Sequence, residues 1–96
     1  MKALLLTFDR NQIARSEVTK ALDRMPEVAD WYAFFGNTVC LLTEAGVRTT
    51  AELIRNAFPE LRFIVTEIDR NRRGGWLPRA VWSFMDKASG AETSAV

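Results

Sequence analysis

The feature that most constrains the fold is an order of strand, helix and strand that occurs twice along the chain. The four expected strands cover 2–8, 28–35, 38–43 and 61–68. Between the two halves, Gly36-Asn37 is a two-residue turn signal that predicts a β-hairpin. Right-handed crossovers would place both helices on the same side of the sheet. We therefore expect an α+β fold of the ferredoxin-like βαββαβ type, with a four-stranded antiparallel sheet and two helices on one face.

Signals for helix starts and for the domain boundary accompany this order. Ser16 is expected to cap the first helix, and Thr49 fits a capping box at the start of the second. A short third helix is expected over 78–87, because proline is common at the first helical position. The single domain should occupy residues 1–87, followed by a small, polar and disordered tail at 88–96.

The strands carry apolar residues on both faces. In the first strand, Leu4 and Leu6 alternate with Ala3 and Leu5. Two helices cover only one face, so the other would leave an apolar surface that needs a further layer. A second copy of the chain is the simplest cover, and we expect a homodimer. The alternative is that the segment 76–85 folds back over part of the sheet.

The composition excludes several classes of function. The 96 residues include no histidine, which rules out His-based triads and His-containing zinc sites. Cys40 is the only cysteine and has apolar neighbours, which favours a buried side chain over a catalytic thiol. The longest apolar run near the start, 3–6, is too short for a signal peptide or a membrane span. We therefore expect a cytoplasmic protein without a membrane partner.

Positive charge is concentrated in one segment, although the net charge is only +1. Residues 69–79 hold four arginines and one acid, whereas the rest of the chain holds nine basic and eleven acidic residues. Arginine can neutralise phosphates, and an exposed tryptophan can stack on a base. The residues expected to bind DNA or RNA are Arg10, Arg70, Arg72, Arg73, Trp76 and Arg79.

A structural alternative exists for these residues. The arginines would pair with acids such as Asp30 or Glu27 in a solvated loop, and Trp76 and Trp82 would pack against the sheet. The two interpretations weigh equally for the arginines, and a core position is favoured for the tryptophans. The aromatic residues of 31–35 could also form a stacking platform. The chain lacks the glycine-aromatic signature of RNA-recognition domains, however, which favours a core or dimer role.

Asp9 stands at the end of the first expected strand, before a polar turn. Together with its symmetry mate in a dimer it could bind Mg²⁺ and activate water for attack on a phosphodiester, as a catalytic and metal-binding residue. Aspartate before a turn also commonly caps backbone N–H groups, and the adjacent Arg10 could pair with it. The structural role is favoured, because hard cations usually collect several oxygen ligands and no second acid is placed beside Asp9 by its spacing.

The run Leu5-Leu6-Thr7-Phe8-Asp9-Arg10-Asn11, with the element order that follows it, resembles the small CRISPR-associated adaptation subunit Cas-two. It is more similar still to the SinR-like proteins grouped with that subunit, in which an aromatic residue and an aspartate end the first strand. The resemblance covers residues 2–87 in order and size. It implies a symmetric dimer of ferredoxin-like domains. Some members hold a divalent metal between two copies of the aspartate and act as nucleases, and others are non-catalytic platforms for duplex DNA.

The end of the chain departs from this family. Cas-two proteins often finish with a fifth strand that pairs with the partner, whereas a helix and the residues 89–96 are expected here. We therefore expect a dimeric nucleic-acid-binding protein of the Cas-two and SinR-like kind, which acts as a Mg²⁺-dependent nuclease or as a platform. The alternative is a non-catalytic dimer that binds a protein or a small effector. A metal-free enzyme of the dimeric ferredoxin-like kind is disfavoured, because such sites usually contain histidine.

Overall fold

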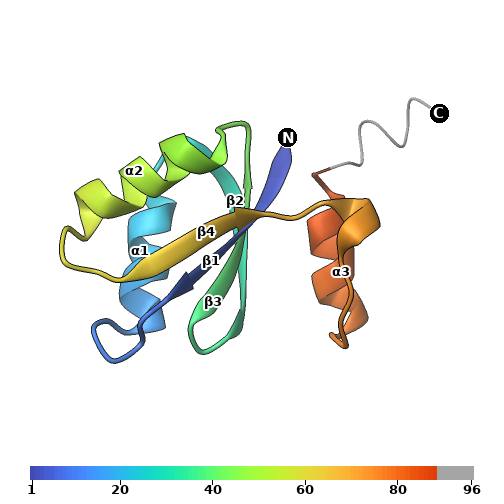
Figure 1. Cartoon of the computed structure of the whole chain (residues 1–96), viewed down its shortest axis with the longest axis horizontal. Coiled ribbons are helices and arrows are strands. Elements are labelled where there is room, and N and C mark those ends of the chain that lie inside the picture. Colours follow the sequence, from blue (N-terminus) through green and yellow to red (C-terminus); the bar gives the residue numbers. More distant parts are fainter. Residues whose placement is uncertain (89–96) are drawn as a thin grey trace.

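The computed structural model describes residues 1–88 and shows one β-sheet with helices on both of its faces (Figure 1). In chain order the elements are β1 (Lys2–Phe8), α1 (Arg15–Asp23), β2 (Val28–Phe35), β3 (Thr38–Thr43), α2 (Val47–Ala57), β4 (Phe63–Glu67), the 3-10 helix η1 (Arg70–Arg72) and α3 (Arg79–Asp86). Neighbouring strands are antiparallel and lie in the order β2-β3-β1-β4. The α+β class, the four-stranded antiparallel sheet, the β-hairpin and the short third helix are confirmed.

The register of the two central strands decides which side chains share a face. Leu4 on β1 lies opposite Leu41 on β3, and Leu6 lies opposite both Val39 and Val65. These residues pack against one another because side chains alternate across a strand, and they form the larger core cluster. The helix residues buried in this cluster are Val18 and Leu22 from α1 and Ile54 from α2. The two long helices therefore cover this first face, as expected.

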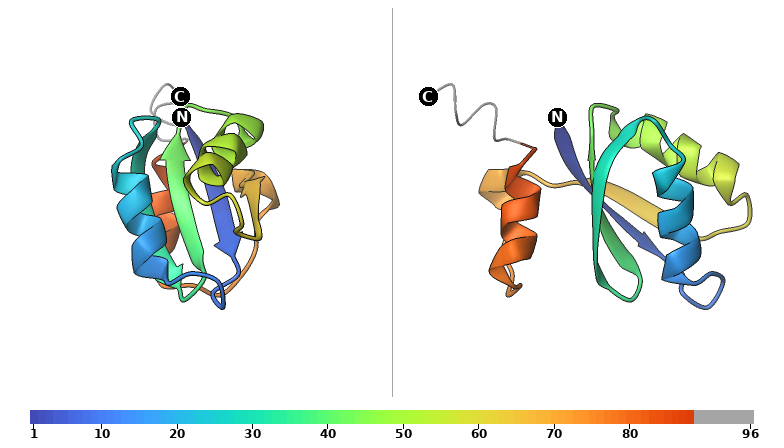
Figure 2. Two further views of the ribbon diagram at one scale, coloured as in Figure 1. Left: turned by 90° about the vertical axis from the view of Figure 1, so that its left-hand side faces the viewer. Right: turned by 180° about the vertical axis from the view of Figure 1, so that it is seen from behind.

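The second face of the sheet is covered in part by α3, which lies on the opposite side from α1 and α2 (Figure 2). Val81, Phe84 and Met85 are buried against residues that include Cys40 and Leu42. Ala88, at the start of the expected tail, belongs to the same cluster. The chain thus folds back over part of its own sheet, which is the alternative to a cover supplied by a second copy. The homodimer stays a prediction, now resting only on the part that α3 leaves open.

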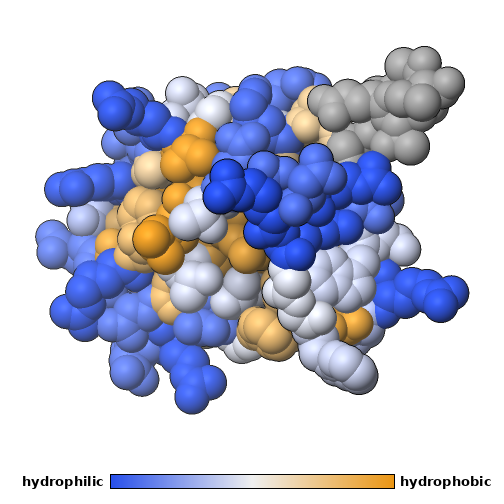
Figure 3. Space-filling view, turned by 45° about the vertical axis from the view of Figure 1, so that its right-hand side comes forward, coloured by the Kyte–Doolittle hydropathy of each residue, from blue (hydrophilic) through white to orange (hydrophobic). Residues whose placement is uncertain are grey.

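That open part is a row of residues across the second face, which we call the uncovered half. Thr7 lies at its centre, paired with Thr38 on one side and Ile64 on the other, and Phe35 is the partner of Thr38 at the end of the row. Phe35 is 53% exposed and Ile64 is 60% exposed. Figure 3 shows an apolar area on the side of β4 and α3, bordered by hydrophilic side chains. Exposed apolar area of this kind is a frequent mark of a binding surface.

Both long helices begin before the residues expected to cap them. The backbone of Ala14 is extended, with ψ 148°, and its carbonyl already accepts from the N–H groups of the first turn. Gly46 plays the same part for α2, where its carbonyl accepts from Thr50 N at 3.0 Å. Ser16 and Thr49 therefore lie inside the first turns, and the expectation that they cap the helices was wrong. Both helices therefore begin earlier in the sequence than the pattern of capping side chains indicates.

Two further expectations concern the ends of elements and of the chain. The last strand is shorter than the expected 61–68, because Leu61 N donates to Phe58 O in a turn before the strand begins. From Ser89 onward the expected tail lies outside the described residues. Within residues 1–88, no helix combines the length and the apolar character needed to cross a membrane.

Candidate nucleic-acid interface

Asp9 holds the turn that follows β1. Its Oδ1 accepts a hydrogen bond from Asn11 N at 2.9 Å, which is the cap expected of an aspartate before a turn. Its Oδ2 accepts from Arg62, at 2.7 Å from Nη2 and 3.2 Å from Nε. Both carboxylate oxygens are therefore engaged, and the cation is Arg62 from the distant loop before β4. The expected pairing of Arg10 with Asp9 was wrong, because Arg62 makes the ion pair.

The same two loops are joined by three further hydrogen bonds. Asp9 N donates to Arg62 O at 3.0 Å, and Arg62 N donates to Gln12 Oε1 at 2.7 Å. Gln12 Nε2 donates to Glu60 O at 2.8 Å. Asp9 is thus one member of a network that fastens the β1–α1 loop to the loop before β4. These contacts give it a clear structural role.

The surroundings of Asp9 do not fit a magnesium site within one chain. Among residues 1–88 there is no group of three or more acidic or cysteine side chains that could hold a metal ion. A cation at Asp9 would have to compete with the Arg62 guanidinium and with the Asn11 N–H for the same two oxygens. Asp9 of one chain therefore does not form a metal site by itself.

The pKa of Asp9 is held below its ordinary value of 3.8, first by the hydrogen bond from Arg62 and then by the one from Asn11 N. A carboxyl whose pKa is lowered in the folded state stabilises the fold above its unfolded pKa, and this contribution is lost as the pH falls through the folded pKa. We expect Arg62→Ala to raise the pKa of Asp9 toward 3.8 and to lessen the loss of stability below about pH 4. Titration of the carboxyl carbon by NMR measures the shift. Arg10→Ala is the matched control, and an equal shift in that variant would assign the effect to Arg10.

The 70–79 segment links β4 to α3, and two of its arginines bind α3. Arg73 Nη2 lies 2.6 Å from Asp86 Oδ1, and Arg70 Nε lies 3.6 Å from the same oxygen. The Arg73 guanidinium also lies over the Trp82 ring, 4.9 Å from its centroid, in a cation–π contact. Arg70 and Arg73 therefore fix the segment on the fold, through Asp86 rather than through Asp30 or Glu27.

The other charged residues of this segment point to solvent. Arg72 and Arg79 are exposed, and neither makes an ion pair within the described part of the chain. Trp76 between them is 99% exposed, so the expected core position was wrong for this residue. For Trp82 the core position is confirmed, because it packs against the second core cluster. The adjacent Leu77 packs against the second core cluster, whereas the Trp76 indole is exposed to solvent.

Arg10 comes from a different part of the molecule. It lies beside the β2–β3 turn, where a Cβ atom at Gly36 would be 3.6 Å from its Nη1. Of the six expected nucleic-acid residues, Arg72, Trp76 and Arg79 form an exposed set, and Arg70 and Arg73 anchor it. Arg10 belongs to the loop of Asp9.

A groove of about 410 Å³ lies beside this exposed set, between the second face and the residues that lead into α3. We call it the second-face groove. Its lining includes Thr7, Phe35, Thr38, Trp76 and Trp82. From the sequence, the aromatic residues of 31–35 are expected in a core or dimer role, and no local pattern links them to Trp76. The close approach of a segment some forty residues further along the chain was the missing information.

Comparisons with protein-family models, with curated proteins and with solved structures find no match for this chain.

Proposed function

We propose that this protein binds nucleic acid without cleaving it, through Arg72, Trp76 and Arg79. The observation that carries the proposal is the full exposure of Trp76 between two exposed arginines, on a segment that Asp86 holds in place. An exposed indole offers a ligand a flat aromatic face on which a planar ring can stack. A nucleic acid would place a base on the indole and its phosphates beside the guanidinium groups.

The role of a binding platform is favoured over that of a nuclease because of Asp9. Both of its oxygens serve the turn and Arg62, and no other acid of the described residues joins it in a metal-binding group. The resemblance to Cas-two and SinR-like proteins supports nucleic acid as the ligand, since that family includes non-catalytic platforms. A second copy of the chain is not required, because the three proposed residues lie on one chain.

The test is binding of a short fluorescently labelled DNA or RNA strand, followed by anisotropy over a range of salt concentrations. Replacing Arg72 and Arg79 together by alanine should weaken binding about tenfold and reduce the slope of log K against log salt by about two. The matched control replaces Arg48 and Arg55, which are exposed on α2, so that the loss of charge is the same. Absence of binding at low salt, or an equal loss in both double variants, would overturn the proposal.

A further inference from the structure

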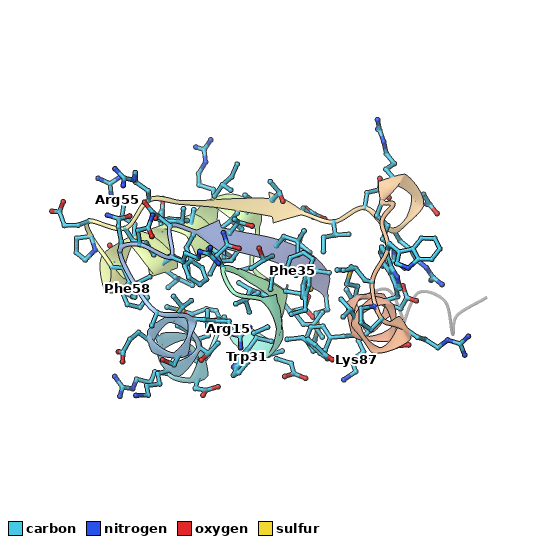
Figure 4. The ribbon with its side chains drawn as sticks, turned by 90° about the horizontal axis from the view of Figure 1, so that it is seen from below. Arg15, Trp31, Phe35, Arg55, Phe58 and Lys87 are labelled. Atoms are coloured by element: carbon cyan, nitrogen blue, oxygen red, sulfur yellow. The ribbon has the colours of Figure 1, made fainter. Side chains whose placement is uncertain are left out.

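The second-face groove has the size and the position of a binding site for a small planar group. Pockets for small ligands usually enclose about 300–1,000 Å³, and the groove encloses about 410 Å³. It opens on the uncovered half of the second face, which none of the three α-helices covers. Figure 4 shows Phe35 on the side of the sheet that faces α3.

Aromatic residues from two distant parts of the chain line the groove. Phe35 lies on the sheet side next to Phe34, with 4.8 Å between the ring centroids. Trp76 comes from the segment that leads into α3 and Trp82 comes from α3 itself, where the Arg73 guanidinium lies over the Trp82 ring. Flat aromatic walls of this kind favour a flat aromatic guest, because stacking is strongest between parallel or offset rings.

The floor of the groove carries two hydroxyl groups. Thr7 Oγ1 and Thr38 Oγ1 are hydrogen bonded to each other at 3.2 Å, and Thr38 Oγ1 also donates to Asn37 Oδ1 at 3.4 Å. With Thr38 donating to Asn37, the shared proton comes from Thr7, which leaves the Thr7 oxygen free to accept another hydrogen bond. A ring with polar atoms on its edge can use this oxygen, whereas a purely aliphatic ligand would leave it without a partner.

Positive charge lies in the segment that contributes residues 73–77 to the lining of the groove. Residues 69–86 contain four arginines and two aspartates, a balance of +2, and Arg72 and Arg79 are exposed. The ligand that fits should therefore carry a negative charge next to its planar ring.

We propose that the second-face groove binds the nucleobase of a nucleotide against Phe35 and Trp76, with the phosphates of the strand along the segment that carries Arg72 and Arg79. This inference rests on the proposed function. It adds that the bound base is not paired or stacked within a duplex, so single strands should bind more tightly than duplexes. A free nucleotide and a nucleotide within a strand offer the same chemistry, and the experiment separates these two sources.

The experiment compares three probes by anisotropy or calorimetry: a short single strand, an abasic strand of the same length and charge, and free adenosine monophosphate. The base-bearing strand should bind at least fivefold more tightly than the abasic strand, and Phe35→Ala or Trp76→Ala should each remove most of this difference. Ile64→Ala is the matched control, since Ile64 is an exposed apolar residue of the same face that does not line the groove. Binding of the free nucleotide with the same dependence on Phe35 would assign the groove to mononucleotides as well.

The possible failures can be told apart. If base-bearing and abasic strands bind equally well, the inference about the base fails while nucleic-acid binding stands. If no strand binds at low salt, the proposed function fails. If light scattering finds a dimer that Phe35→Ala dissociates, the groove belongs to an interface with a second copy and the inference is overturned. Both replaced rings are more than half exposed, so the variants should fold, and thermal melting checks this.

Discussion

Replacing Leu41 by alanine is expected to lower the free energy of unfolding by about 3 kcal/mol. Leu41 is fully buried on β3, opposite Leu4 on one neighbouring strand and Trp31 on the other. It faces α1 and α2, so the lost methyl groups would leave a cavity between the sheet and both helices.

Urea unfolding, followed by far-UV circular dichroism, measures this change. Ile64→Ala removes a side chain that is 60% exposed, and its effect should stay within about 0.5 kcal/mol. A loss below about 1 kcal/mol for Leu41→Ala would mean that the sheet and the two helices do not pack as described.

Replacing Phe84 by alanine is expected to cost about 3 kcal/mol and to loosen α3 from the second face. Phe84 is 5% exposed, and its ring lies edge-on to Tyr32 with 5.4 Å between centroids. Lys87 Nζ also lies over the Phe84 ring, 5.1 Å from its centroid. The phenylalanine is the largest apolar side chain that α3 buries, so its removal weakens the main attachment of the helix.

Cys40 reports whether α3 itself has moved. Burial raises the pKa of the Cys40 thiol to about 12, and the side chain lies in the cluster that α3 covers. We expect a thiol reagent to label Cys40 slowly in the native protein and much faster in Phe84→Ala, because the reactive form is an accessible thiolate. Trp76→Ala, on the exposed part of the preceding segment, is the control and should leave labelling unchanged. Equal labelling rates in all three proteins would show that α3 does not protect the second face.

The fold could be predicted largely from local patterns. The bounds of β1, β2 and β3 agree with the expected ranges, because apolar runs of this length end at recognisable turn residues such as Gly36-Asn37. Prediction failed at the starts of the helices, where the loop backbones of Ala14 and Gly46 take the capping role without a side chain.

The candidate site could be predicted only in part. The concentration of arginine in the 70–79 segment was visible in the sequence, but its division into anchoring and exposed residues was not. Asp86 decides that division, because it binds Arg70 and Arg73 and leaves Arg72 to solvent. The same is true of Asp9, whose partner Arg62 lies 53 residues away along the chain.

The sequence by itself determined the order of the elements, the alternation that makes both faces of the sheet apolar, and the absence of histidine chemistry. These follow from residue types and from their spacing along the chain, because the periodicity of helices and strands depends only on local sequence. Only the tertiary structure decided that α3 covers part of the second face, that Trp76 is exposed to solvent, and that this tryptophan and Phe35 line the same groove. Those facts depend on contacts between distant segments, and the side of the sheet on which such a segment packs is set by the balance of all its contacts rather than by its own pattern.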